Sequence, residues 1–329
     1  MKPNALYHHA SFSWLQITPL TTSLMTLIDA AVYHSNTLWL FTKSDFMTTM
    51  IPIVRTLFLS FYESNRLNLS QSLFAIVAAP LTSLRNLPHL VFWLWFHLLH
   101  FNTSNQTASL EDETNKPDRP LPAGRITLHT AVLLRWTLMP MCWALSLAYS
   151  KEVMFSSMAL SAFTGMYNEL GGSGSHFVFR YALNGLGFAA FEAGTALVAK
   201  DDKTFLDSAG WLAIFLSGSI FATTIYAQDF RDVVGDSLIN RDTIPLRFGS
   251  ISRTVLLCGV VAWSIALSYI WKLDLCSAIV FTALGQFAGA RFMLYTTVED
   301  DRESYFYYNV WVSVAHILPG YWRVLHATA

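Results

Sequence analysis

The chain has 329 residues, of which 53% are hydrophobic and only 13% are charged, and its net charge is −1. Soluble globular proteins carry roughly 25% charged residues, so the composition excludes an ordinary soluble domain and indicates a chain that lies mostly in lipid. The near-zero charge excludes nucleic acid as a partner. The three cysteines, Cys142, Cys258 and Cys276, lie in or beside apolar runs and predict neither a disulfide framework nor a metal site.

Apolar segments recur along the chain and predict an all-α integral membrane protein with eight or nine transmembrane helices. Residues 1–45 are only weakly apolar and predict an N-terminal interfacial segment, whereas residues 46–329 predict a transmembrane helical domain. Residues 46–84 hold one or two spans. The remaining predicted spans are 87–103, 126–149, 153–168, 177–199, 205–228, 252–272, 274–296 and 303–323.

Two polar stretches, 105–125 and 228–247, interrupt the apolar pattern. Four predicted spans separate them, and an even number of crossings places both stretches on the same side of the membrane. Loops rich in Lys and Arg face the cytoplasm, so we expect the cytoplasmic side. The cations of the two stretches are Lys116, Arg119, Arg125, Arg231, Arg241 and Arg247.

Each polar stretch carries a row of oxygen-bearing side chains at helical spacing. The second stretch has Asp229, Asp232 and Asp236, at offsets that share one face of a helix. The first row shares a face if its helix continues past Phe101, and it consists of Asn105, Ser109, Asp112 and Glu113. Facing carboxylates repel one another unless cations intervene. Mg²⁺ prefers such ligands and leaves places for phosphates, and Arg and Lys contact phosphate directly. The pattern therefore predicts a diphosphate clamp at the mouth of an apolar cavity.

Two segments resemble motifs of the UbiA superfamily of intramembrane prenyltransferases. DFRDVVGD, followed by RDTIPLRFG, is similar to the second Asp-rich motif of the family and the element that follows it. NKPDRPLPAGR is similar to the segment that follows the first motif. The resemblance covers residues 70–325. It implies a helical bundle around a central apolar cavity and Mg²⁺-dependent ionisation of a prenyl diphosphate.

The resemblance also assigns roles to individual residues. Asp229, Asp232 and Asp236 would hold Mg²⁺ and act in catalysis, and Asn105 would match the leading Asn of the first motif. The candidate diphosphate contacts are Lys116, Arg119, Arg231, Arg241 and Arg180. Arg180 is the cation nearest to the position where the family has a Lys. Tyr226 lies one helical turn before Asp229, and its aromatic face could stabilise a cation.

The first motif departs from the family pattern. Asn105, Ser109 and Glu113 instead resemble the Mg²⁺-binding triad of class I terpene cyclases, whereas a register anchored on Asn115 would make Asp112 the surviving carboxylate. The triad favours a cyclase that converts a prenyl diphosphate, farnesyl diphosphate above others, into a terpene.

Two alternatives stay open. One is a prenyltransferase that moves the prenyl group to an aromatic or other acceptor. The other is an anion transporter with binding sites at broken helices. Some fungal members of the superfamily are terpene cyclases, and the resemblance to them implies the endoplasmic reticulum membrane. The cations of the two stretches predict that the acidic motifs face the cytoplasm. No protein partner is indicated.

Overall fold

The computed structural model describes residues 18–45, 85–108 and 116–326, and these residues form helices and loops without any strand. The predictions for Ser109, Asp112 and Glu113, and for spans within 46–84, lie outside the described residues. The helices are α1 (Thr18–Thr42), η1 (Lys43–Asp45), α3 (Asn86–Ala108), α5 (Leu128–Leu147), α6 (Lys151–Asn168), η3 (Gly172–Gly174), α7 (Phe177–Ala199), α8 (Ser208–Thr224), η4 (Ile225–Gln228), α9 (Asp229–Leu238), α10 (Ile244–Phe248), α11 (Ile251–Ile270), α12 (Leu275–Leu294) and α13 (Val298–His326).

The chain divides into two compact units, Met1–Trp39 and Leu40–Ala329. In the first unit the described part is helical and belongs to α1. The second unit contains η1 and all helices from α3 to α13, so residues 40–45 group with the bundle. Every residue of the site described below belongs to this second unit.

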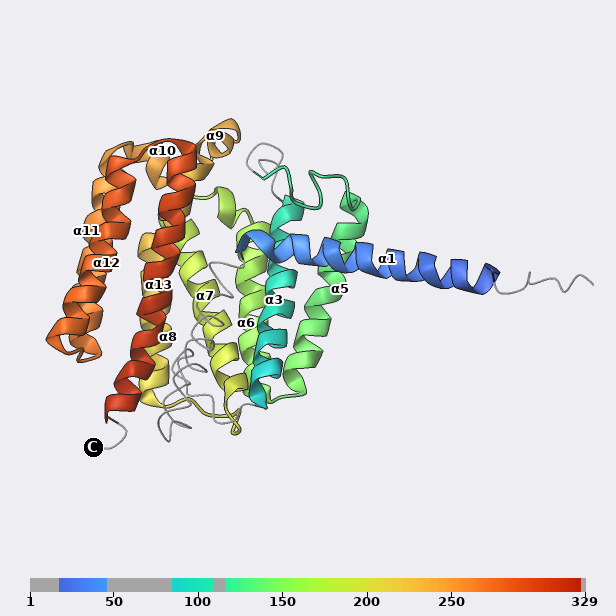
Figure 1. Ribbon diagram of the computed structural model, residues 1–329, viewed down its shortest axis with the longest axis horizontal. Coiled ribbons are helices and arrows are strands. Elements are labelled where there is room, and N and C mark those ends of the chain that lie inside the picture. Colours follow the sequence, from blue (N-terminus) through green and yellow to red (C-terminus); the bar gives the residue numbers. More distant parts are fainter. Residues whose placement is uncertain (1–17, 46–84, 109–115, 327–329) are drawn as a thin grey trace, which may run out of the picture. The chain divides into compact units, whose positions relative to one another are not determined.

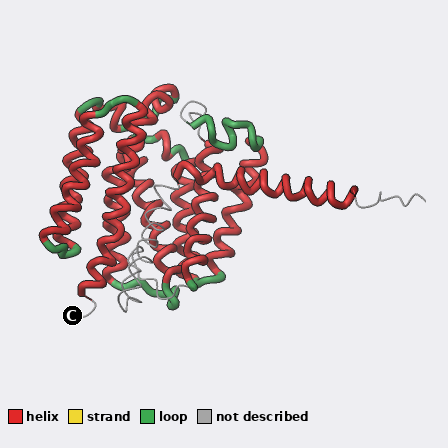
Figure 2. Tube along the Cα trace, viewed as in Figure 1, coloured by secondary structure: helices red, strands yellow, loops and turns green. Residues whose placement is uncertain are grey.

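Five helical stretches of the described residues are long and apolar enough to cross a membrane: Leu128–Leu147, Phe177–Ala199, Ser208–Leu238, Ile251–Ile270 and Leu275–Leu294. An integral membrane protein is therefore confirmed, while the number of eight or nine spans stays a prediction. The long helices from α3 to α13 run side by side, and the loops between them lie at the two ends of the bundle (Figures 1 and 2).

Several helices begin where the sequence offers a capping side chain. Thr127, Ser150, Asp207 and Asp274 precede α5, α6, α8 and α12, and each accepts a hydrogen bond from the backbone N–H three residues later. Such a cap satisfies a backbone donor that the first turn leaves without a partner. These short polar residues thus fix where the chain turns back into the bundle.

Small residues let α7 and α8 pack closely. A Cβ atom at Gly185 would lie 2.4 Å from the backbone oxygen of Gly218, so this crossing tolerates no side chain at that position. Helix interfaces in membranes often use small residues in this way. The close contact fixes α8, and with it the acidic segment that follows α8 in the chain.

The apolar helix α8 ends at Thr224, and the chain then forms one 3₁₀ turn, η4, before α9 begins at Asp229. This break differs from the predicted uninterrupted span over 205–228. Helices α9 and α10 lie at the same end of the bundle as the C-terminal end of α3 (Figure 1). The described parts of the two polar stretches therefore lie at one end of the bundle, and their position on one side of the membrane stays a prediction.

Candidate active site

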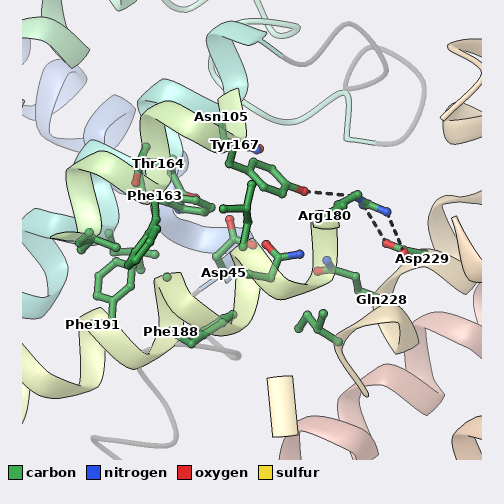
Figure 3. Close-up of a pocket in the computed structure, with 18 of the residues that line it drawn as sticks. Asp45, Asn105, Phe163, Thr164, Tyr167, Arg180, Phe188, Phe191, Gln228 and Asp229 are labelled. Atoms are coloured by element: carbon green, nitrogen blue, oxygen red, sulfur yellow. Dashed lines mark hydrogen bonds and ion pairs between the residues drawn. The ribbon is translucent and has the colours of Figure 1, made fainter. Parts of the chain in front are cut away.

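A cavity of about 120 Å³ opens between α3, α6 and α7 and the η4–α9 segment. Its walls are formed by residues from all four of these parts of the chain, as well as by Asp45 at the end of η1 and by cations that follow α3 and α9. In Figure 3, Arg180 and Asp229 lie at one side of this space and Phe188 and Phe191 at the other. The cavity therefore has a charged end and an aromatic end.

The same gradient runs along each of three helices. On α7, the cavity-lining residues change from Arg180 through Asn184 to Phe188 and Phe191. On α6 they change from Tyr167 and Thr164 to Phe163 and Leu160, and on α3 from Asn105 and Asn102 to Phe101 and Leu98. Residues three or four positions apart share a helix face, so each helix presents one continuous stripe to the cavity. The three stripes align polar with polar and apolar with apolar.

Asp229 is the first residue of α9 and is fully buried, with 1% of its side chain exposed. Both guanidinium Nη atoms of Arg180 donate to its two oxygens, at 3.0 and 3.1 Å. The hydroxyl of Tyr181 donates to Oδ2 of Asp229 at 2.5 Å. The Nε of Arg180 donates to the hydroxyl of Tyr167 at 3.3 Å, as drawn in Figure 3. A planar guanidinium matches a carboxylate in this two-bond geometry, so the pair is firmly held.

The other two carboxylates of α9 also face cations. Asp232 lies 3.3 Å from Nζ of Lys116 and lines the cavity. Asp236 is buried and accepts from Nη1 of Arg241 at 2.9 Å. Asp236 itself does not line the cavity, whereas Arg241 does. The row predicted from spacing is thus a real helix face, and its first two members reach the cavity.

The first polar stretch contributes from the end of α3. The helix continues past Phe101 to Ala108, which is the condition for the shared face of the first row. Asn105 lines the cavity, with its amide nitrogen 3.3 Å from the amide oxygen of Asn168. Arg119 also lines the cavity, is 5% exposed and lies 3.4 Å from Oδ2 of Asp45. Four of the five predicted diphosphate contacts therefore meet at this cavity: Lys116, Arg119, Arg180 and Arg241.

Besides Asp236, two predicted site residues lie away from the cavity wall. Tyr226 is buried, and its hydroxyl donates to the backbone oxygen of Ser252 at 3.4 Å. Arg231 has its guanidinium 4.3 Å from the ring centroid of Tyr305 and 4.0 Å from Asp232. Neither residue lines the cavity. Their predicted roles, in catalysis and in diphosphate binding, gain no support from this geometry.

The donor set at the charged end fits a hard cation. The carboxylates of Asp229 and Asp232 and the side-chain amides of Asn105 and Gln228 line the same cavity, and carboxylate and amide oxygens are the ligands that Mg²⁺ takes. Within the described ranges no group of three or more His, Cys, Asp or Glu side chains forms a metal site. This agrees with the pairing of each α9 carboxylate with a cation, and the set of metal ligands stays a prediction.

Sequence reasoning missed several lining residues, including Asp45, Tyr167, Asn184 and Gln228. Gln228 directly precedes Asp229, so its position beside the Asp-rich motif could have predicted that it lines the cavity. Tyr167 and Asn184 lie on the polar part of the stripes of α6 and α7. Helical spacing from Arg180 and from Leu160 would have found these two residues. Asp45 carries no local sequence pattern that points to the site.

Comparison with known proteins agrees with this architecture. Residues 69–311 match the model of the UbiA prenyltransferase family, and this chain belongs to that family. It is therefore an enzyme of the UbiA type, a cyclase or a prenyltransferase, and the alternative of an anion transporter is wrong.

The relatives with curated functions include two terpene-forming enzymes. The chain is 30% identical over 289 residues to the fumagillin beta-trans-bergamotene synthase af520 of Aspergillus fumigatus, covering 86% of this chain and 91% of that protein. It is 28% identical to the diterpene cyclase eriG of Hericium erinaceus, covering 80% of this chain and 88% of that protein. A solved UbiA homologue from Archaeoglobus fulgidus, bound to DMAPP and Mg²⁺, has the same fold with a TM-score of 0.58 at 13% identity, covering 87% and 97% of the two chains.

Proposed function

We propose that this enzyme ionises a prenyl diphosphate with Mg²⁺ and closes the released allylic cation on its own hydrocarbon chain to give a terpene, with farnesyl diphosphate as the substrate. The observation that carries the proposal is the single cavity that changes from four cations and two carboxylates of α9 at one end to Phe and Leu side chains at the other. A molecule with an anionic head and an apolar tail matches that gradient. The kinship with terpene-forming relatives favours cyclisation.

The charged end binds and activates the leaving group. Lys116, Arg119, Arg180 and Arg241 offer N–H donors to the diphosphate oxygens. Asp229 and Asp232, with the amide oxygens of Asn105 and Gln228, would hold Mg²⁺, which supplies further stabilisation of the charge that develops on the departing diphosphate.

Ionisation breaks the C1–O bond, and the electron pair leaves with the diphosphate. Charges already in place around the leaving group stabilise the transition state without reorganisation.

The aromatic end receives the cation. Phe163, Phe188 and Phe191 line it, and aromatic faces attract cations through their negative quadrupole. Phe188 also stacks on Phe221, with ring centroids 3.7 Å apart and planes within 13°, which holds its ring in a fixed orientation. In this aromatic pocket a double bond of the chain attacks the cation, a new C–C bond forms, and loss of a proton yields the neutral product.

The length of the cavity supports a C15 substrate. Arg180 and Phe191 are 11 residues apart on α7, which corresponds to about 16 Å at 1.5 Å per residue. An extended carbon chain advances about 1.25 Å per bond from standard bond lengths and angles, so a farnesyl chain spans about 14 Å and a geranylgeranyl chain about 19 Å. The farnesyl chain alone is shorter than this distance and the geranylgeranyl chain alone is longer, so the C20 chain has to fold more than the C15 chain to stay within the lined region.

The test uses microsomes that contain the enzyme, with farnesyl diphosphate and Mg²⁺ and without any added acceptor. We expect a cyclic C15 product by gas chromatography with mass spectrometry. The product should be absent with EDTA and strongly reduced in an Asp232→Asn variant. Diphosphate release that requires an added phenolic acceptor would instead establish a prenyltransferase, the second candidate, which the name of the family favours. Absence of release under both conditions would refute both functions.

We also propose that the chain lies in the endoplasmic reticulum membrane with its charged end facing the cytoplasm. The support is the number of cations near α9 and after α3. Two variants, each with a single cysteine, test the orientation: Asn240→Cys in the loop between α9 and α10, and Asp202→Cys in the loop between α7 and α8. Both positions are exposed, and the two loops lie at opposite ends of the bundle (Figure 1). In sealed microsomes a membrane-impermeant maleimide should label the first and spare the second, and the reverse pattern would invert the topology.

A further inference from the structure

The charged end of the cavity is neutralised by its own side chains. Arg180 pairs with Asp229 at 3.0 Å, Lys116 with Asp232 at 3.3 Å, Arg241 with Asp236 at 2.9 Å and Arg119 with Asp45 at 3.4 Å. Four cations thus face four carboxylates, of which three belong to α9 and one belongs to η1. A site of this kind offers neither a concentrated negative charge to a metal nor a concentrated positive charge to a phosphate.

We propose that this internal pairing makes the metal and the diphosphate bind as a coupled pair, with Arg180 exchanging Asp229 for diphosphate oxygens when both ligands arrive. The inference rests on the proposed function, because it concerns the same ligands. It adds a role for Arg180 that the diphosphate-binding assignment does not contain: in the substrate-free protein its guanidinium occupies the carboxylate that the metal needs.

Burial makes the exchange all-or-none at the Arg180–Asp229 pair. The two side chains are 3% and 1% exposed, and an unpaired charge at such a position is strongly destabilising. A metal ion that takes Asp229 alone strands the guanidinium of Arg180. A diphosphate that takes Arg180 alone strands the carboxylate of Asp229. Only the two ligands together leave every charge with a partner. Each ligand therefore raises the affinity for the other, and the coupling free energy between the two sites is favourable.

The structure allows this movement. Arg180 and Asp229 both line the cavity, so each can reach a ligand there without a change in the backbone. Arg180 lies in the first turn of α7, and its Nε keeps a hydrogen bond to the hydroxyl of Tyr167. That bond can hold the guanidinium at the cavity wall while its two Nη atoms change partners. Tyr181 donates to Asp229 independently and keeps the carboxylate in place.

The test is equilibrium dialysis of the purified protein in detergent, with radioactive Mn²⁺ alone and with labelled pyrophosphate in the presence and absence of Mn²⁺. For the wild type we expect Mn²⁺ to raise the affinity for pyrophosphate at least about tenfold, within the range usual for coupled sites. In Arg180→Gln the competing guanidinium is gone. This variant should bind Mn²⁺ alone more tightly than the wild type, and its Mn²⁺ effect on pyrophosphate should fall below about threefold.

A matched control removes a comparable pair elsewhere. Arg253 donates to both oxygens of Asp301, at 2.7 and 2.8 Å, and does not line the cavity. Arg253→Gln should leave Mn²⁺ affinity unchanged, so a gain restricted to Arg180→Gln separates competition from general loosening. If Arg180→Gln does not fold, Lys116→Gln replaces it as the test. Its partner Asp232 also lines the cavity, so this variant should likewise bind Mn²⁺ more tightly than the wild type.

The outcomes separate the two proposals. No pyrophosphate binding by the wild type with Mn²⁺ present would refute the proposed function itself. Binding of both ligands without mutual enhancement would overturn the coupling and leave the function standing. Weaker or equal Mn²⁺ binding by the folded Arg180→Gln variant would also overturn it, because Arg180 would then support the metal site instead of competing for it.

Discussion

Phe191 lies at the apolar end of the cavity, and its truncation tests whether the length of that cavity selects the prenyl chain. The ring is 7% exposed and lines the cavity about 16 Å along α7 from Arg180. Phe191→Ala opens space at the place where the fourth isoprene unit of a geranylgeranyl chain would extend. We expect the variant to accept geranylgeranyl diphosphate better, relative to farnesyl diphosphate, than the wild type does.

The magnitude follows from the apolar surface that the extra unit can bury. Five more carbons are worth at most about 4 kcal/mol at roughly 0.8 kcal/mol per buried methylene. If only a quarter of that is realised, the ratio of kcat/KM for the C20 and C15 substrates rises about fivefold. Truncation of a buried Phe also costs about 3–5 kcal/mol of folding stability, which lowers both activities. The ratio cancels that loss.

The assay is diphosphate release from each substrate by the same detergent-solubilised preparation. Phe215→Ala is the matched control, because Phe215 on α8 is 69% exposed and does not line the cavity. Its ratio should equal that of the wild type. A folded Phe191→Ala protein whose ratio is also unchanged would refute the argument, since chain length would then be selected elsewhere.

Three further results are expected. Asp232→Asn should lower diphosphate release on the order of 100-fold, as loss of one charge-stabilising group does. Its melting temperature should change little, because Asp232 is partly exposed at the cavity. Release at the wild-type rate would contradict the role of Asp232. Gly185→Ala should cost about 1–3 kcal/mol and lower the melting temperature, because its Cβ meets backbone 2.4 Å away, whereas Gly259→Ala has open space and should not. The hydrogen bonds from Arg323 lower the pKa of Asp207; this stabilisation is present above the unfolded pKa of about 3.9 and is lost as the pH falls through the lower folded pKa. Arg323→Met should therefore melt earlier than the wild type at pH 7, and the difference should shrink below about pH 4; a constant difference would contradict the linkage.

The helical architecture and one end of the site followed from the sequence because both depend on local spacing. The offsets of Asp229, Asp232 and Asp236 predicted a shared helix face, and α9 contains all three. The apolar runs predicted spans because a chain in lipid satisfies its backbone polar groups within each helix. The break after Thr224 was not predicted, because the apolar run continues through it without Gly or Pro.

The pairing within the site could not be predicted in the same way. Arg180 and Asp229 are 49 residues apart in the chain, and no local sequence pattern near either residue predicts that the two form a pair. Spacing had suggested that the three α9 carboxylates act as one metal-binding row. The structure gives each a cation from a different segment, so the partners depend on how α7, α9 and the stretch after α3 pack together.

The stripes on α3, α6 and α7 show a pattern between these two cases. On α7, Arg180, Asn184, Phe188 and Phe191 follow the three-to-four-residue spacing of one helix face, and the polarity falls steadily along it. Mean hydropathy treats this helix as a membrane span with two charged residues and discards the order of its residues. A stripe that faces lipid is expected to be polar only where it reaches the headgroup region of the membrane. A graded stripe on three helices, with its polar ends on the same membrane side, indicates a shared cavity for an amphipathic ligand. The sequence thus predicts which end of the cavity takes the anionic group of the substrate and which end takes the apolar tail. It does not predict the ion pairs at the charged end.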